Sequence, residues 1–118
     1  MNIESFREYC LSKKGTTEGF PFDDQVLVFK VMGKMFALAD VDLFESINLK
    51  CDPAKAIELR EEYPSIVAGY HMHKKHWNTI AIDGLLSDAF LKDLIDHSYQ
   101  LVVAKLPRRL RSELEVEG

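Results

Sequence analysis

Hydrophobic positions near the start of the chain recur at helical spacing. Ile3, Phe6 and Cys10 lie three and four residues apart, which places them on one face of a helix. Asn2 precedes them as a candidate N-cap, and Gly15 follows as a stop signal. The pattern therefore predicts a first helix between Asn2 and Gly15.

Two runs of β-forming residues follow, at residues 25–32 (QVLVFKVM) and 34–39 (KMFALA). Gly33 separates them and can take the positive φ of a tight turn, so the pattern predicts a hairpin. Residues 16–24, before it, mix strand formers with glycine and proline. Residues 46–51 alternate between polar and apolar side chains, a period of two that is typical of a half-exposed strand.

Two further helices are predicted in the second half of the chain. Asp52 is a candidate N-cap, and Pro53 suits the first position of a helix. This helix ends before Pro64, because the residue preceding a proline is pushed out of the helical region. A last helix begins after Ser87 as its N-cap and ends at Pro107, with apolar residues at helical spacing between them.

The remaining segments of the second half are predicted to be extended or irregular. Residues 66–82 are rich in strand formers, with a loop near residues 73–75 and a clearer strand at 77–82. The tail, residues 108–118, is polar, and we expect it to fray.

The order of these elements predicts the fold class. One helix is followed by about four strands, a helix, about two strands and a last helix, without strand-helix-strand alternation or an internal repeat. We therefore predict an α+β fold with a largely antiparallel sheet. The first and last helices are each apolar on one face only, so both should cover one side of the sheet and leave the other side partly exposed. The 118 residues suffice for one core, and we expect a single domain over residues 1–118.

Composition and charge exclude several classes of protein. The 47% of apolar and 29% of charged residues are typical of globular domains and exclude disordered or fibrous chains. No apolar run approaches the ~20 residues of a membrane helix, so we expect no membrane association. Cys10 and Cys51 fit neither a disulfide framework nor a metal or redox motif, and the start lacks a signal-peptide pattern. We expect a cytoplasmic, reduced protein.

The formal net charge of −4 means that contact with nucleic acid requires a local basic patch. Residues 63–82 and 97–112 contain no Asp or Glu, and they hold all four histidines. If both segments lie on one side of the fold, they form such a patch. The predicted phosphate contacts are the basic residues of these segments, with two hairpin lysines as secondary contacts: Lys74, Lys75, Arg108 and Arg109, then Lys30 and Lys34.

Two neighbouring residues of the same region could position or stack on a base. Trp77 adjoins His76, and aromatic stacking beside cationic phosphate contacts suits single strands, hairpin loops or a minor-groove wing. The competing interpretation is that Trp77 packs against the sheet, which is the commoner role of a lone tryptophan at the start of a strand.

A metal site is a weaker hypothesis from the same segment. His71, His73 and His76 offer imidazole ligands, and residues two apart on a strand share a face. Lys74 and Lys75 place two positive charges within this cluster, and no carboxylate or thiolate lies nearby in the sequence. We predict no physiological metal and no other cofactor.

Signals for catalysis are absent from the sequence. There is no glycine loop for phosphate, no nucleophile elbow and no nucleotide fingerprint. Cys51 falls on the apolar side of an alternating strand, where an inert thiol is expected, and Cys10 falls on the apolar face of the first helix. We therefore expect no enzymatic activity.

A protein-interaction module is the alternative function. The hairpin of residues 25–39 has apolar residues on both faces, a surface that could bind a peptide or a second copy of the chain. Burial of its large apolar side chains would remove that surface: Phe29, Val31, Phe36 and Leu38.

Several short motifs in register make the chain resemble the MmcQ/YjbR family of small bacterial proteins. The most specific is Lys-x-His-Trp, formed by Lys74, His76 and Trp77. The others span nearly the whole chain: Phe29-Lys30-Val31, Lys34-Met35-Phe36-Ala37, Leu49-Lys50 leading to Pro53, Tyr70-His71-Met72, Asn78-Thr79, Asp83-Gly84, Ser98-Tyr99 and Leu106-Pro107.

The resemblance implies an α+β fold of the secretion-chaperone-like kind and a DNA-binding role that rests on two hairpin wings, without enzymatic activity. His73 stands where the family usually carries Asn, which weakens the metal hypothesis further. Residues and resemblance together predict a monomeric domain that binds nucleic acid non-specifically or with weak specificity.

Overall fold

The computed structural model describes residues 1–69 and 72–116 and confirms the α+β class. Its strands form one six-stranded antiparallel sheet with the order β1-β2-β3-β4-β6-β5. The elements follow the predicted order through the third helix, and a fourth helix is added after it: α1 (Ile3–Leu11), β1 (Thr16–Gly19), β2 (Val26–Val31), β3 (Lys34–Asp40), β4 (Ser46–Lys50), α2 (Pro53–Glu62), β5 (Ile66–Ala68), β6 (Trp77–Ala81), α3 (Asp88–Ala104) and α4 (Arg108–Val116).

The predicted helix starts are confirmed by their capping hydrogen bonds. The side chain of Asn2 accepts from the backbone N–H of Ser5 at the start of α1. Asp52 accepts from the Lys55 N–H at α2, which has Pro53 in its first turn. Ser87 caps α3 in the same way. Each cap satisfies an N–H that would otherwise lack a partner within the helix.

The predicted turn at Gly33 is also confirmed. Met32 and Gly33 have φ values of 48° and 84°, so both central residues of the β2–β3 turn are in the left-handed region. Two positive φ values in a two-residue loop are typical of the hairpin turn that matches the twist of its strands, and glycine adopts such a φ without strain.

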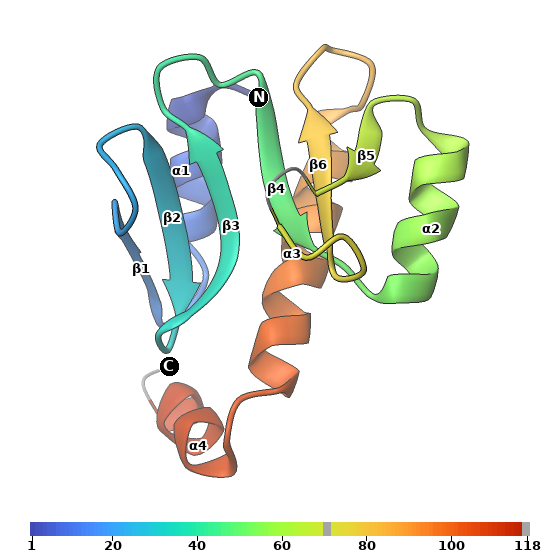
Figure 1. The fold of residues 1–118 in the computed structure, drawn as a ribbon. Helices are drawn as coiled ribbons and strands as arrows, with labels where there is room; N and C mark the ends of the chain where they lie inside the picture. The colour runs from blue at the N-terminus through green and yellow to red at the C-terminus, as the bar shows by residue number, and fades with distance from the viewer. Residues whose placement is uncertain (70–71, 117–118) are drawn as a thin grey trace.

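Helices cover one face of the sheet and leave the other face open (Figure 1). α1 and α3 lie behind the sheet, α2 lies beside the β5 edge, and α4 lies beyond the lower end of α3. Phe6, Phe29 and Phe36 are fully buried on the covered face, in a cluster that runs through the whole domain. The first and last predicted helices correspond to α1 and α3, and the prediction that both cover one side of the sheet is confirmed.

Ser98 ties α3 to the sheet where β3 and β4 separate. The pairing of these strands begins at Ala37 and Leu49, so the backbone groups of the residues just before Ala37 and just after Leu49 need other partners. The Ser98 hydroxyl donates to the carbonyl of Phe36 and accepts from the N–H of Lys50 at 2.9 Å. A fully buried hydroxyl thus satisfies a backbone group on each strand.

The prediction that the polar tail frays is wrong for residues 108–116, which form α4. Leu106 and Leu114 are buried in the core cluster, and Leu110 packs against it. Leu110 and Leu114 are four residues apart within α4, so they share one face of this helix, and Leu106 lies just before its start. The amine of Lys14 also donates to the carbonyl of Glu115 at 3.0 Å.

The open face is lined by alternate residues of the central strands. The register places Val28 opposite Leu38, Leu38 opposite Asn48, and Asn48 opposite Thr79. Lys50 lies opposite Trp77 further along the same two strands.

Within residues 1–69 and 72–116, none of the helices combines the length and apolar character that crossing a bilayer requires.

Candidate nucleic-acid interface

A group of basic segments and an acidic loop lie at opposite ends of the sheet. The lower end in Figure 1 holds the β2–β3 turn, the end of β4, the start of β6 and the end of α3. The upper end holds the loop after β3, with Asp40, Asp42 and Glu45. Basic segments that are far apart in the sequence therefore meet at the lower end.

Five side chains at the lower end form what we call the cationic end: Lys50, His73, Lys75, His76 and Lys105. Partial burial, together with the charge of Lys105, lowers the pKa of Lys50. Loss of solvation lowers the pKa of His76, and the other four members lower it further. His76 therefore lies within electrostatic range of the other four groups, and Lys50 lies within range of Lys105.

The lysines of the cationic end have no carboxylate partner among residues 1–69 and 72–116. The ion pairs found there join the N-terminal amine to Asp88, Arg7 to Glu18, and Lys13 to Asp96, all elsewhere in the molecule. Like charges held together without a counter-charge destabilise the fold, and a bound anion would relieve that repulsion.

The loop that carries the histidines is fixed to its neighbours. The carbonyl of His76 accepts from the Cys51 N–H at 2.8 Å, next to Lys50. The Arg60 guanidinium donates to the carbonyl of Lys74 at 3.3 Å and links the loop to α2. The exposed Lys74 therefore lies on the same loop as His73 and Lys75, beside the cationic end.

Trp77 has a packing role, and the prediction that its ring stacks on a base is not supported. Its side chain is only 7% exposed. The backbone of Gly69 passes so close that a Cβ there would lie 2.8 Å from the Cβ of Trp77 and 3.1 Å from that of Met72. Only glycine permits this approach without a shift, and the loop leaves little of the indole open to a ligand.

The hairpin lysines also lie at the lower end of the sheet, but they are separated from the five residues of the cationic end. Lys30 pairs with Met35 near the β2–β3 turn, and Lys34 begins β3. Two strand spacings separate β2 from β4, which places Lys30 roughly 10 Å from the row of Lys50. Lys30 and Lys34 could therefore contact a second part of a long ligand.

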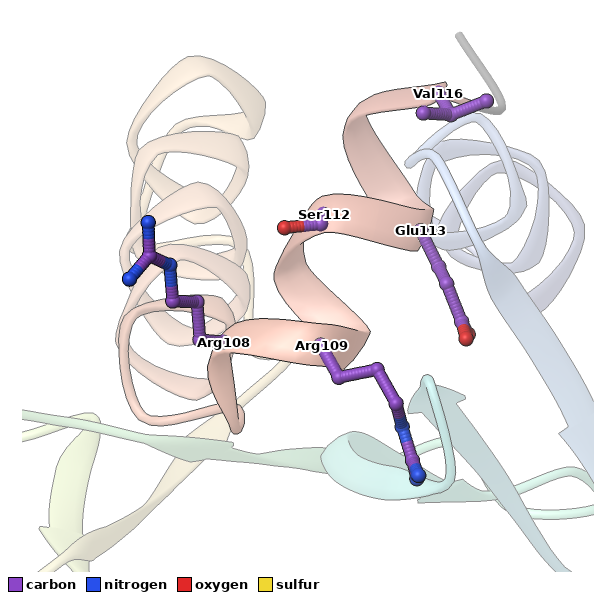
Figure 2. A pocket seen from close by; sticks show the side chains of 5 residues that line it. All are labelled: Arg108, Arg109, Ser112, Glu113 and Val116. Carbon is purple, nitrogen blue, oxygen red and sulfur yellow. The ribbon is translucent and has the colours of Figure 1, made fainter.

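Arg108 and Arg109 both belong to α4, but they do not converge. Figure 2 shows Arg108 extending from one side of the helix and Arg109 from the other, on the side of the β2–β3 hairpin. The hollow beside them is lined by α4 residues alone, including Ser112 and Glu113. The two arginines flank the lower end of the molecule as separate exposed charges.

A groove of about 420 Å³ lies on the open face of the sheet. Phe22, which is 64% exposed, and Met72 contribute apolar side chains from two different loops. The hydroxyl of Thr79 donates to Oδ1 of Asn48 at 2.6 Å. The rest of the lining comes from the strands: Val26, Leu38, Ala39, Asp40 and Ser46.

The hairpin does not offer the apolar contact surface that the alternative function needs. Its four large apolar side chains are all buried, and Leu38 is the most exposed of them at 6%. Three of the four belong to the core under the helices: Phe29, Val31 and Phe36.

Cys51 and His97 meet on the covered face, where both groups are held neutral. They line a cavity of about 10 Å³ together with Asn78, which is room for no more than one water molecule. Burial raises the pKa of the Cys51 thiol and lowers the pKa of His97. Burial also raises the pKa of the Cys10 thiol. Neither thiol is in the activated thiolate form that nucleophilic catalysis needs.

The three-histidine metal hypothesis gains no support from the described residues. The rings of His73 and His76 are 5.0 Å apart between centroids. His71 lies outside the described residues. In the described part of the chain, no three His, Cys, Asp or Glu side chains are grouped so that they could hold a metal ion.

A family model for YjbR matches residues 11–101, which is most of the chain. The chain belongs to the YjbR family. It is 32% identical to YjbR of Escherichia coli K12 over 115 residues, covering 97% of this chain and 98% of that protein. It is 44% identical to YbdF of Escherichia coli O157:H7 over 91 residues, covering 76% and 75%. Both relatives are described as uncharacterised proteins.

Solved structures of YjbR-like proteins share the fold. The crystal structure of Deinococcus radiodurans protein DR2400 superposes with a TM-score of 0.90 at 40% identity, covering 97% of this chain and 88% of that one. A crystal structure of a Pseudomonas syringae protein superposes with a TM-score of 0.72 at 29% identity, covering 86% and 98%.

The motifs that resemble the YjbR family divide between the fold and the cationic end. Ser98 joins α3 to the sheet, and the Tyr99 hydroxyl donates to the carbonyl of Lys14. Asp83 accepts from the hydroxyl of Ser65 at 2.7 Å. In contrast, Lys50 and His76 belong to the cationic end.

Sequence reasoning missed Lys50 and Lys105 as site residues, although the alternation of Ser46, Asn48 and Lys50 already placed Lys50 on the polar face of its strand.

Proposed function

We propose that the protein binds nucleic acid through the cationic end, without catalysis and with little sequence specificity. The observation that supports this most is the group of Lys50, Lys75 and Lys105 with two histidines and no carboxylate partner in the described part of the chain. Phosphate groups spaced along a strand are the ligand class that neutralises several such cations at once.

The surrounding charges extend this surface. Lys74 lies on the same loop, Lys30 and Lys34 lie on the hairpin, and the α4 arginines flank the lower end. A ligand longer than one phosphate would contact several of them in turn. Contacts of this kind fix the position of the backbone and do not read base sequence, so we propose weak specificity.

A fluorescence-anisotropy titration at 50 and 200 mM salt tests the proposal with duplex and single-stranded oligonucleotides. For the duplex, four phosphate contacts predict a log-log salt slope of about −3.6, and hence roughly a hundredfold weakening between the two salt concentrations. The test variant is Lys75→Glu/Lys105→Glu, because both side chains are exposed and can be changed without disturbing the core.

The matched control is Lys92→Glu, another exposed lysine on α3 but near the opposite end of that helix. The proposal predicts much weaker binding by the double variant and little change in the control. Equal binding by all three proteins, or no binding at 50 mM salt, would contradict it.

A further inference from the structure

The groove on the open face lies next to the cationic end. Asn48, in the groove, and Lys50 are two residues apart on the same face of β4, which separates them by roughly 7 Å along the strand. Met72, on one side of the groove, belongs to the loop that carries His73 and Lys75. A ligand in the groove can therefore reach the lysines with an anionic group.

The other end of the groove carries a carboxylate. One oxygen of Asp40 accepts from the backbone N–H groups of Asp42 and Leu43 at 2.9 and 3.0 Å. Its second oxygen accepts no hydrogen bond from residues 1–69 or 72–116, and Asp40 lines the groove. The lining of the groove is thus mostly apolar, with a hydrogen-bond acceptor at one end and positive charges beyond the other.

We propose that this groove binds one nucleobase of a single strand while the cationic end binds the adjoining phosphate. The inference rests on the proposed function and specifies its substrate class. The exposed ring of Phe22 supplies a stacking surface, and Asp40 accepts from the exocyclic amine of cytosine or adenine. An aliphatic anion would match the apolar lining and Lys50 but would leave Asp40 without a partner.

Single strands are favoured over duplexes for a physical reason. A base in a duplex is stacked on both faces and paired along its edge, so it enters a groove only after it has been unstacked. In a single strand the base face is available, and stacking on an aromatic side chain then adds to the phosphate contacts. Electrostatics alone would favour the duplex, because its charge density is higher.

The test compares a deoxycytidine oligonucleotide, a thymidine oligonucleotide and a duplex of equal length by fluorescence anisotropy at 50 mM salt. The variant is Phe22→Ala, and the matched control is Leu85→Ala; these side chains are 64% and 75% exposed, so neither change disturbs the core. Phe22→Ala should weaken binding of the deoxycytidine strand by about 5- to 150-fold and leave duplex binding unchanged. Leu85→Ala should change neither.

A second variant tests the polar end of the groove. Asp40→Asn keeps an acceptor for the two backbone N–H groups but replaces the charged oxygen that faces the groove. It should reduce the preference for deoxycytidine over thymidine strands, because thymine has no exocyclic amine.

The outcomes separate this inference from the proposed function. Absence of binding to all three ligands would overturn both. Equal binding of single strands and duplex, with no effect of Phe22→Ala, would overturn the inference and leave the proposed function in place. A wild-type dimer that Phe22→Ala converts to a monomer would show that a second copy fills the groove, and would also overturn the inference.

Discussion

The two faces of the sheet use the same alternating strands for different purposes. On the covered face, Phe36 and Ile47 are fully buried, and the titratable Cys51 and His97 are held neutral. On the open face, the neighbouring positions supply a groove and Lys50, whose charge has no carboxylate partner in the described part of the chain. The covered face stabilises the fold, whereas the open face carries like charges whose repulsion a bound anion would reduce.

The largest expected contrast is between two phenylalanines on opposite faces. Phe36→Ala removes a fully buried ring that packs edge-on against Tyr99, and should lower the free energy of unfolding by about 3–5 kcal/mol. Phe22→Ala removes an exposed ring and should change it by less than about 0.5 kcal/mol. Urea unfolding of both variants measures the difference, and similar losses would contradict the division between the faces.

A smaller loss is expected where α3 joins the covered face. Ser98→Ala leaves the carbonyl of Phe36 and the N–H of Lys50 without the hydroxyl that both use, which should cost about 1–3 kcal/mol. The exposed Ser112 provides the control, since Ser112→Ala should have almost no effect. Equal stabilities of the two variants in thermal unfolding would mean that the Ser98 hydroxyl does not stabilise the contact between α3 and the sheet.

Protonation of the histidines on the two sides should have different consequences, for stability at His97 and for ligand binding at His76. Burial, then Lys55, lowers the pKa of His97, so its unfolded form binds protons more strongly, and stability should fall as the pH drops below about 6.5. His97→Gln should make the free energy of unfolding depend less on pH between about pH 7 and 5. Most carboxylates titrate below this range, so they contribute little to the change. His73→Gln, at an exposed position, should not reduce this dependence on pH.

His76 should instead favour the ligand when it is protonated. Its pKa is also lowered, first by loss of solvation and then by the neighbouring cations, so it is neutral at pH 7 in the free protein. A bound phosphate favours the charged form, and nucleic acid should therefore bind more tightly as the pH falls through 6. Titrations of wild type and His76→Gln at pH 8 and pH 6 would show this difference; equal affinities at both pH values in wild type would exclude the role.

The smallest effect concerns repulsion within the cationic end. Lys105→Gln removes a positive charge that lowers the pKa of Lys50, so it should leave stability unchanged or raise it by up to about 0.5 kcal/mol. The same substitution should weaken nucleic-acid binding. A loss of stability in chemical unfolding would mean that Lys105 has a structural partner.

Local signals explain why most elements could be predicted from the sequence. Asp52-Pro53, Ser87 and Gly33 act through nearby backbone groups, so their effects do not depend on the rest of the fold. The helix α4 was missed because its docking depends on Leu110 and Leu114, two leucines within a polar tail whose contacts lie far away in sequence.

The candidate site was only partly predictable for the same reason. The acid-free segments pointed to Lys75 and His76. Lys50 and Lys105 join them only because β4 and α3 both end at the lower end of the sheet. The burial of Trp77 follows from the path of Gly69 above it, which no residue pattern indicates. Family resemblance supplied the fold but not the position of the groove.

Amide chemical shifts during titration with a deoxycytidine oligonucleotide would test the central claim most directly, because they locate the binding surface residue by residue. The account predicts that the largest changes cluster at Lys50, residues 72–76 and Lys105, with smaller changes along the groove as far as Asp40. Changes confined to α1 or to the upper loops, or no change at low salt, would contradict the claim that the cationic end binds nucleic acid.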